Sequence, residues 1–192
     1  LIWTYGMATF NWIIKESKLP WLKLDIEFPF EEMLNEAKNI RKYFVEHRAE
    51  EQIHGYRHKG WASLSLHGIS HNHTNHFSSY GYGSNRETPY KWTEISSKCP
   101  VTTNFFKNIY PCDNYYRLRF MLLKPEGYIA PHNDMQEHKL SPVNIALNHP
   151  KGCLMKMVKH GTVPFKQGEA YLLDVGNIHA YYNKSHEDRY HI

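Results

Sequence analysis

The chain has few cysteines and no long apolar run. The first argues against a disulfide-stabilised protein, and the second against a protein with a membrane-spanning helix. Its three cysteines, Cys99, Cys112 and Cys153, are widely spaced and form no C-x-x-C pair. An odd, scattered set suits free thiols in a reducing compartment better than a disulfide framework, so we expect a cytoplasmic protein. The sequence holds no run of 18 apolar residues and has a mean hydropathy of -0.64, so no membrane-spanning helix is expected.

Basic residues are present but are not gathered into a stripe. The formal net charge is +4 at pH 7, with lysines and arginines scattered along the sequence. Nucleic-acid binding normally needs a clustered basic patch, so no nucleic acid is expected as a partner. Residues 1–10 lack a charged segment followed by a long apolar one, so no signal peptide is expected among them.

The N-terminal part contains one clear helical pattern. Residues 29–50 place apolar side chains at helical spacing, with acidic residues first and basic residues later. This predicts an amphipathic helix that buries one face. The apolar positions are Phe30, Met33, Leu34, Ala37, Ile40 and Phe44.

The remainder of the chain is rich in short β-like runs. Residues 61–66 alternate apolar and polar side chains, and residues 100–108 suit a short helix. Seven further runs are separated by Gly and Pro turns: 115–123, 128–131, 143–147, 153–158, 170–174, 178–182 and 189–192. We therefore expect one mainly β domain over 1–192, with 1–60 as a helical N-terminal support and 61–192 as a double-stranded β-helix of the jelly-roll, cupin-like type.

Residues 67–94 form a long polar stretch rich in His, Tyr, Gly and Ser. Loops of this length in a compact domain tend to be binding loops or lids. The histidines at 67, 71, 73 and 76 match no zinc spacing, and a solvated loop is the simpler interpretation. His73, Tyr82 and Arg86 are candidates for contacts with a substrate carboxylate or peptide.

Arg117 and Arg119 alternate with apolar residues on an expected strand, so both should face the same side. If that side is the interior of the fold, at least one of them binds an anion of the substrate or co-substrate. If it is the exterior, they are ordinary surface charges. We expect at least one to lie inside.

His132, Asp134 and His179 are the candidate metal ligands. His132 and Asp134 are two positions apart, so on an extended strand end they project from the same face. A lone H-x-D is more often a surface turn, but a later histidine completes the ligand set of non-haem Fe(II) and leaves three coordination positions open. Arg189 follows His179 and can hold the far carboxylate of a dicarboxylic keto acid that chelates the metal beside O₂.

The residues from Cys99 to Ile192 resemble the aspartyl/asparaginyl β-hydroxylase-like family of Fe(II)/2-oxoglutarate oxygenases, a jelly-roll group that also contains free-proline hydroxylases. The residues from Trp61 to Gly68 match only loosely. The shared motifs are Cys99-Pro100-Val101-Thr102, Arg119 to Leu123 leading through Lys124-Pro125-Glu126-Gly127 to Pro131-His132-Asn133-Asp134, Asn148-His149-Pro150-Lys151-Gly152-Cys153, Gly168-Glu169-Ala170-Tyr171-Leu172-Leu173-Asp174, His179, Asn183 and Arg189.

The resemblance implies that His132, Asp134 and His179 bind iron and that Arg189 pairs with the distal carboxylate of 2-oxoglutarate. Some members place a second basic residue on the strand after the first histidine, whereas this chain has Leu140-Ser141-Pro142-Val143-Asn144. Ser141 and Asn144 are therefore candidates for hydrogen bonds to a carboxylate.

These patterns favour an Fe(II)/2-oxoglutarate-dependent dioxygenase that hydroxylates an amino-acid side chain, free or in a peptide, with succinate and CO₂ as co-products. Two alternatives stay open: a cupin-like metalloenzyme that uses no keto acid, and a non-catalytic jelly-roll binding domain. A small-molecule or peptide substrate is the expected partner. The sequence identifies neither the substrate nor the oligomeric state, because specificity lies in the loops.

Overall fold

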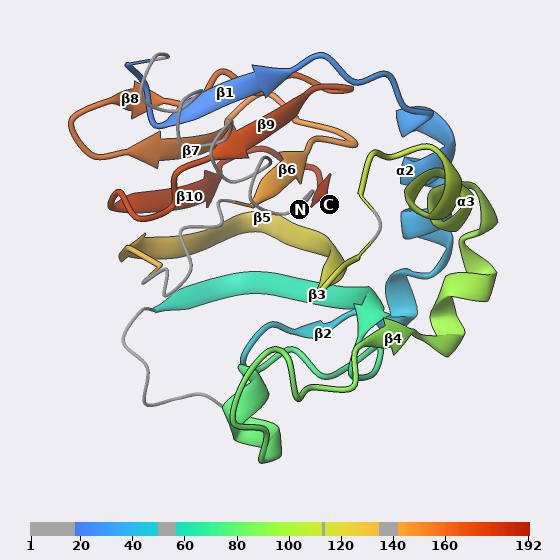
Figure 1. Ribbon diagram of the computed structural model, residues 1–192. Helices are drawn as coiled ribbons and strands as arrows, with labels where there is room; N and C mark the ends of the chain where they lie inside the picture. Colours follow the sequence, from blue (N-terminus) through green and yellow to red (C-terminus); the bar gives the residue numbers. More distant parts are fainter. Residues whose placement is uncertain (1–17, 50–56, 113, 135–141) are drawn as a thin grey trace.

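Two antiparallel β-sheets face each other, with two helices packed at one end (Figure 1). The computed structural model describes residues 18–49, 57–112, 114–134 and 142–192. The smaller sheet has the order β1-β9-β6, formed by β1 (Trp21–Leu24), β9 (Ala170–Leu173) and β6 (Val143–Ile145). The mainly β, jelly-roll class expected from the sequence is confirmed.

The larger sheet has the order β2-β3-β5-β10-β7-β8, and all its pairings are antiparallel. Two further strands lie off this path, with β4 paired to β3 and β11 paired to β5. The strands are β2 (Val45–Glu46), β3 (His58–Gly68), β4 (Lys91–Trp92), β5 (Leu118–His132), β7 (Cys153–Met157), β8 (Gly161–Thr162), β10 (His179–Asn183) and β11 (Arg189–His191).

Strand β5 is one continuous bent strand, whereas the sequence pattern predicted two strands broken at residues 124–127. The bend is possible because Gly60 on β3 lies against this turn. A Cβ atom on Gly60 would lie 3.3 Å from the Gly127 Cα atom, and a Cβ atom on Gly127 would lie 2.9 Å from the Lys59 carbonyl oxygen. Gly60 has a φ of 67° and Glu126 a φ of 58°, both in the left-handed region. The close approach keeps the two strands paired, so β5 continues to His132.

Helix α2 spans Phe30–Asn39, so it ends about halfway along the segment 29–50 that was expected to be helical. After it the chain forms a short 3₁₀ helix, η1 (Arg41–Tyr43), and then β2, which pairs with β3. The Phe44 ring packs edge-on against the Tyr190 ring at 6.0 Å. The apolar spacing thus continues beyond Asn39, but pairing with the sheet overrides the helical propensity there. β1 and β2 also lie within the segment expected to be a helical support.

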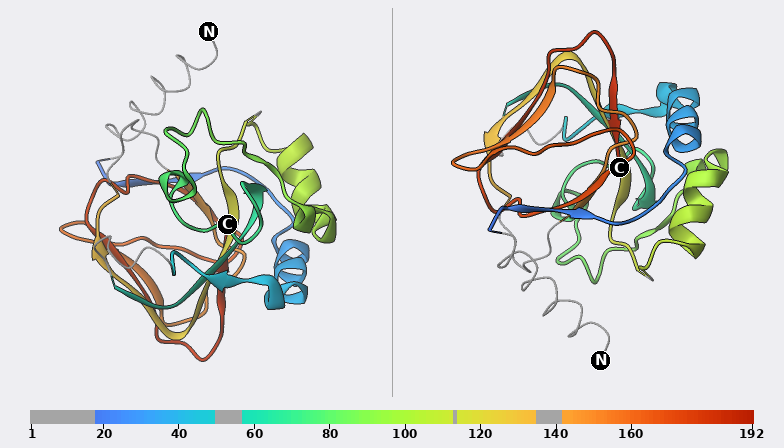
Figure 2. Two further views of the ribbon diagram at one scale, coloured as in Figure 1. Left: turned by 90° about the horizontal axis from the view of Figure 1, so that it is seen from below. Right: turned by 90° about the horizontal axis from the view of Figure 1, so that it is seen from above.

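Helix α3 (Pro100–Asn108) packs beside α2 and confirms the short helix expected over 100–108 (Figures 1 and 2). Two short 3₁₀ helices precede it, η2 (Phe77–Tyr80) and η3 (Glu94–Lys98). No helix in the described ranges is both long and apolar enough to cross a membrane. The division of 1–192 into one domain stays a prediction.

Apolar side chains form two clusters. The first joins α2 and α3 to the larger sheet through residues such as Met33, Phe105 and Phe120, all at most 1% exposed. The second joins the two sheets, with Leu173 from the smaller sheet and Met155 from the larger one. All three cysteines are free, and burial raises the pKa of Cys99 to about 12, so this thiol stays protonated.

Glu36 on α2 caps the first turn of α3. Its Oε1 atom accepts a hydrogen bond from the Val101 backbone N–H at 2.8 Å, and its Oε2 atom accepts from the backbone N–H and the hydroxyl of Thr102 at 2.9 and 2.7 Å. A carboxylate at a helix N-terminus satisfies N–H groups that have no partner within the helix. This cap fixes one helix against the other.

We expect Glu36→Ala to lower the free energy of unfolding by about 1–3 kcal/mol, because two backbone N–H groups lose their acceptor. Glu32→Ala, an exposed change on the same helix, should alter it by less than about 0.5 kcal/mol. Urea unfolding of both variants measures the difference. Equal stability of the two variants would show that the cap has no structural role.

Candidate metal centre

The strand register brings the two candidate histidine ligands together. His132 at the end of β5 lies directly opposite His179 at the start of β10. Their ring centroids are 4.3 Å apart. Asp134 follows β5, and its backbone N–H donates to the Val175 carbonyl at 3.0 Å, which holds it beside the start of β10. Three residues predicted from their spacing are therefore neighbours in the folded chain.

Both imidazoles turn their Nε2 atom toward Asp134 and their Nδ1 atom toward a backbone carbonyl. The Nδ1 atom of His132 lies 2.7 Å from the Ala130 carbonyl oxygen, and that of His179 lies 2.9 Å from the Asn177 carbonyl oxygen. Since a carbonyl only accepts, each Nδ1 carries the proton and each Nε2 keeps a lone pair. The two Nε2 atoms lie 4.0 and 3.8 Å from the Asp134 carboxylate oxygens.

Burial keeps the two rings suited to binding a cation. The side chains of His132 and His179 are 8% and 2% exposed, whereas that of Asp134 is 44% exposed. Burial is the main cause that lowers the pKa of His132, which favours the neutral ring that a metal requires. The two histidines thus form a buried wall, and the carboxylate lies toward solvent.

The geometry fits one metal ion. The ligand atoms of His132, Asp134 and His179 all lie within 4.8 Å of one another, and in the described part of the chain this is the one group of three or more such residues with that property. Metal bonds of about 2.0–2.2 Å from two nitrogens and one oxygen can meet at a point between them after a small side-chain shift. Two imidazoles and one carboxylate suit Fe(II).

Arg189 is a buried cation on β11, which pairs directly with β5, the strand that carries His132. It is 3% exposed, and burial lowers the pKa of its guanidinium, although an arginine keeps its charge. Within the described ranges its Nε atom has no hydrogen-bond partner, and no carboxylate forms an ion pair with it. A buried charge without a counter-ion is costly, so this position favours an anionic ligand.

Tyr181 lies between Arg189 and the two candidate histidine ligands. Its ring centroid is 5.8 Å from that of His179 and 5.3 Å from the Arg189 Cζ atom. Tyr181 follows His179 by two positions on β10, so the two side chains share one face of the strand. One continuous interior surface therefore connects the histidines to the guanidinium. Sequence reasoning missed Tyr181, although its strand alternation with His179 was a usable signal.

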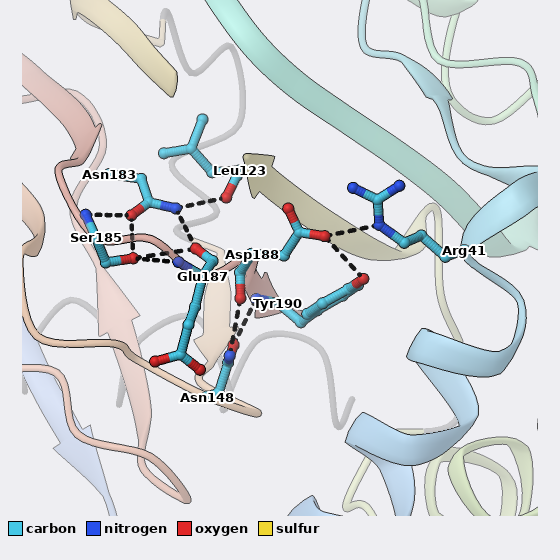
Figure 3. Close-up of polar contacts among 8 residues, drawn as sticks. All are labelled: Arg41, Leu123, Asn148, Asn183, Ser185, Glu187, Asp188 and Tyr190. Carbon is cyan, nitrogen blue, oxygen red and sulfur yellow. Dashed lines mark hydrogen bonds and ion pairs between the residues drawn. The ribbon is translucent and has the colours of Figure 1, made fainter. Parts of the chain in front are cut away.

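A hydrogen-bond network fixes the turn before Arg189 (Figure 3). The buried Asn183 donates from Nδ2 to the carbonyls of Leu123 and Glu187, both at 2.8 Å, and accepts at Oδ1 from the hydroxyl of Ser185 at 2.6 Å. Asn148 donates to the Asp188 carbonyl at 2.9 Å and accepts from the Tyr190 N–H at 2.6 Å. Both residues flanking Arg189 are thus anchored by an asparagine.

The predicted co-substrate contacts have different outcomes. Asn144 lies on β6, and its Oδ1 atom is 2.6 Å from Nδ1 of the buried His191. Its amide is therefore already engaged on one side, and a role in binding 2-oxoglutarate stays a prediction. Ser141 lies outside the described residues.

Arg117 and Arg119 gather with Arg48 around a buried histidine. His47 is 1% exposed, and its Nδ1 atom lies 2.7 Å from the Ser63 hydroxyl oxygen. Burial, together with the charges of Arg119, Arg48 and Arg117, lowers the pKa of His47 well below its ordinary value. The charge of Arg48 also lowers the pKa of His132, so this cationic group reaches the metal centre. Arg48 was missed from the sequence because it follows a short strand with no motif.

The loop residues predicted to contact substrate lie between β3 and β4. The His73 ring packs on Tyr80 at 4.4 Å, Tyr82 is half-buried, and Arg86 is exposed. The loop is tied to the cationic group through Thr74, whose hydroxyl oxygen accepts from the Arg48 N–H at 3.0 Å. Direct contact of these three residues with a substrate stays a prediction.

Comparison with known proteins assigns the chain to a family. The family model described as aspartyl/asparaginyl beta-hydroxylase matches residues 25–192, which include all three candidate ligands and Arg189. No curated protein matches the chain. Among solved structures, the chain is similar to a Pseudomonas putida prolyl-4-hydroxylase at 12% identity and a TM-score of 0.43, with 91% of this chain and 90% of that chain covered.

We expect His132→Ala, Asp134→Ala and His179→Ala each to weaken Mn(II) binding at least about 10-fold, since even the loss of a residue that only orients a ligand typically costs 10–100-fold. Titration calorimetry of the full chain measures this affinity. His160→Ala removes an exposed histidine and should leave the affinity unchanged. Unaltered Mn(II) binding by the three ligand variants would mean that the ion binds elsewhere.

Asn183→Ala should lower the free energy of unfolding by about 2–4 kcal/mol, because two buried carbonyls lose their donor. Asn108→Ala, an exposed change at the end of α3, should cost less than about 0.5 kcal/mol. Chemical denaturation compares the two. A loss for Asn183→Ala no larger than that for Asn108→Ala would contradict the anchoring role.

Proposed function

Because the chain belongs to the aspartyl/asparaginyl β-hydroxylase family, we propose that it is an Fe(II)- and 2-oxoglutarate-dependent hydroxylase of an amino-acid side chain, free or in a peptide. The family supports hydroxylase activity. The dependence on iron and on the keto acid is our inference from the site. The observation that carries it is the buried Arg189, connected by Tyr181 to a group of two histidines and one carboxylate.

His132, Asp134 and His179 would hold the metal. With both Nδ1 protons donated to backbone carbonyls, the Nε2 lone pairs are oriented before a cation arrives. When bound, Fe(II) with 2-oxoglutarate and O₂ supplies the oxidising power that inserts oxygen into a C–H bond, with succinate and CO₂ as co-products. The protein contributes the ligand geometry and a site from which water is excluded.

Arg189 would anchor the far carboxylate of 2-oxoglutarate. A guanidinium presents a planar pair of donors that matches a carboxylate in both charge and orientation. Ligation at one end and this pair at the other would fix a dicarboxylate along the Tyr181 ring. Tyr181 excludes water along that path, because it is 9% exposed and packs within the cluster that joins the two sheets.

The cationic group of Arg48, Arg117 and Arg119 favours a substrate with a carboxylate. It flanks the metal centre on the β3 and β5 side, where the charge of Arg48 acts on His132. The partial exposure of Asp134 marks the side of the centre that is open to an incoming molecule. An amino acid or an acidic peptide has the charge that this surface would bind.

Succinate release separates this proposal from its rivals. The protein is incubated with Fe(II), 2-oxoglutarate and O₂, with panels of free amino acids and acidic peptides, and both succinate and the gain of one oxygen atom are measured by mass spectrometry. A cupin-like enzyme that uses no keto acid would release no succinate. A binding domain would neither release succinate nor modify any member of the panels.

We expect Arg189→Ala to raise the 2-oxoglutarate concentration for half-maximal succinate release at least about 10-fold, because a charge-assisted bidentate pair is worth about 1.5–3 kcal/mol. Arg189→Lys should retain part of the affinity, because it keeps the charge but not the fork. Lys159→Ala is an exposed control. Unchanged co-substrate dependence in Arg189→Ala would remove Arg189 from the proposed site.

A further inference from the structure

A series of hydrogen bonds runs beside Arg189 through the buried His191 and the partly buried His149. The Nε2 atom of His149 lies 3.0 Å from the Cys153 carbonyl oxygen, and its Nδ1 atom lies 3.2 Å from Nε2 of His191. Nδ1 of His191 lies 2.6 Å from the terminal oxygen of the Asn144 side chain. This series of hydrogen bonds thus links the loop before β7 to β11 and then to β6.

The two rings share an apolar neighbour, Phe165. His191 is fully buried, and the Phe165 ring packs against both His149 and His191, with centroids 5.5 and 4.9 Å away. His191 follows Arg189 by two positions on β11, so both side chains face the same way. The hydrogen-bonded histidines are therefore part of the wall that surrounds the Arg189 guanidinium.

Two backbone carbonyls are fixed acceptors here, that of Cys153 beside His149 and that of Asn148 beside His191. The Cys153 carbonyl can only accept, so His149 must carry a proton on Nε2. If His149 is neutral, its Nδ1 is an acceptor and His191 must donate from Nε2. A neutral His191 then has a bare Nδ1, which needs a donor from Asn144.

Asn144 can supply that donor by turning its amide. A carboxamide rotated by 180° about its last bond keeps its shape and exchanges Nδ2 for Oδ1, so the same contact becomes a hydrogen bond from Nδ2 to His191. The other arrangement, with Oδ1 toward His191, requires a proton on both nitrogens of His149. That arrangement would place a second, partly buried cation beside Arg189.

The surroundings disfavour this second cation. Burial, and after it the charge of Arg189, lowers the pKa of His149 to about 4 and that of His191 well below its ordinary value. Near neutral pH both rings are then uncharged. The described residues around this chain include no carboxylate that makes a hydrogen bond to either ring.

We propose that His149 and His191 form a neutral pair, each protonated on Nε2, that holds the Asn144 carboxamide with its NH₂ group toward His191. His191 is then a positioning residue for the wall around Arg189. Held by His191, the Asn144 amide keeps its second Nδ2 hydrogen and its Oδ1 atom in fixed directions. The neutral His191 adds no charge to this wall. The effect on 2-oxoglutarate binding rests on the proposed function, whereas the proton order does not.

Imidazole nitrogen NMR tests the proton order directly. Two-bond ¹H–¹⁵N correlation spectra of the ¹⁵N-labelled full chain near neutral pH distinguish protonated from bare ring nitrogens. The signals are assigned by their loss in His149→Gln and His191→Gln. Protonated Nε2 and bare Nδ1 on both rings are expected. A proton on Nδ1 of His191, or on both nitrogens of His149, would overturn the proton order.

Two matched substitutions test the positioning role. The amide of His191→Asn reaches the place of the ring Nδ1 and retains the contact with Asn144, whereas the amide of His191→Gln reaches the place of Nε2 and retains the contact with His149. His191→Gln should raise the half-saturating 2-oxoglutarate concentration about 2- to 10-fold, the value of one neutral hydrogen bond. His191→Asn should raise it less than about 2-fold, and His160→Gln is the exposed control.

The outcomes separate this inference from the proposed function. Equal rises for His191→Asn and His191→Gln, with equal losses of thermal stability, would show that His191 only fills space and would overturn the positioning role. Absence of succinate release by the unmodified protein would refute the proposed function, and the positioning of a co-substrate with it. The NMR spectra would still confirm or reject the neutral histidine pair.

Discussion

The register of β5 with its neighbours is the constraint on which the site depends. Pairing with β10 places His132 opposite His179, and pairing with β11 places Leu123 opposite Arg189. One strand therefore positions both the candidate metal ligands and the cation that faces the same interior. A shift of one residue in either pairing would turn the side chains to the opposite face of the sheet and separate the group.

Two local features maintain this register. Gly60 and Gly127 allow β3 and β5 to approach closely at the bend, so β5 reaches the metal centre without a break. Asn183 and Asn148 replace the missing strand pairing at the turn between β10 and β11 with side-chain hydrogen bonds. This side-chain network thus stabilises the backbone around Arg189, and none of its hydrogen bonds involves the guanidinium.

The sequence predicted the β class and the proximity of His132 and Asp134 because both depend on short-range patterns. Strand alternation and the spacing of His132 and Asp134 are local, and the structure brings the predicted His179 to them. The predicted end of α2 and the predicted break in β5 were wrong, because pairing with strands distant in the sequence determines both features. Arg48, Tyr181 and the partners of His191 carry no motif, so only the folded chain reveals them. The roles of His73, Tyr82 and Arg86 stay predictions.

The most direct test of the account is an anaerobic titration of 2-oxoglutarate into the Fe(II)-loaded protein, followed by visible absorption. Chelation of Fe(II) by a keto acid produces a charge-transfer band. The account predicts that this band saturates when each bound iron holds one molecule of 2-oxoglutarate. Asp134→Ala should abolish the band because it removes a ligand of the metal. No band in the unmodified protein, or a band unchanged in Asp134→Ala, would contradict the claim that these residues form one site for iron and 2-oxoglutarate.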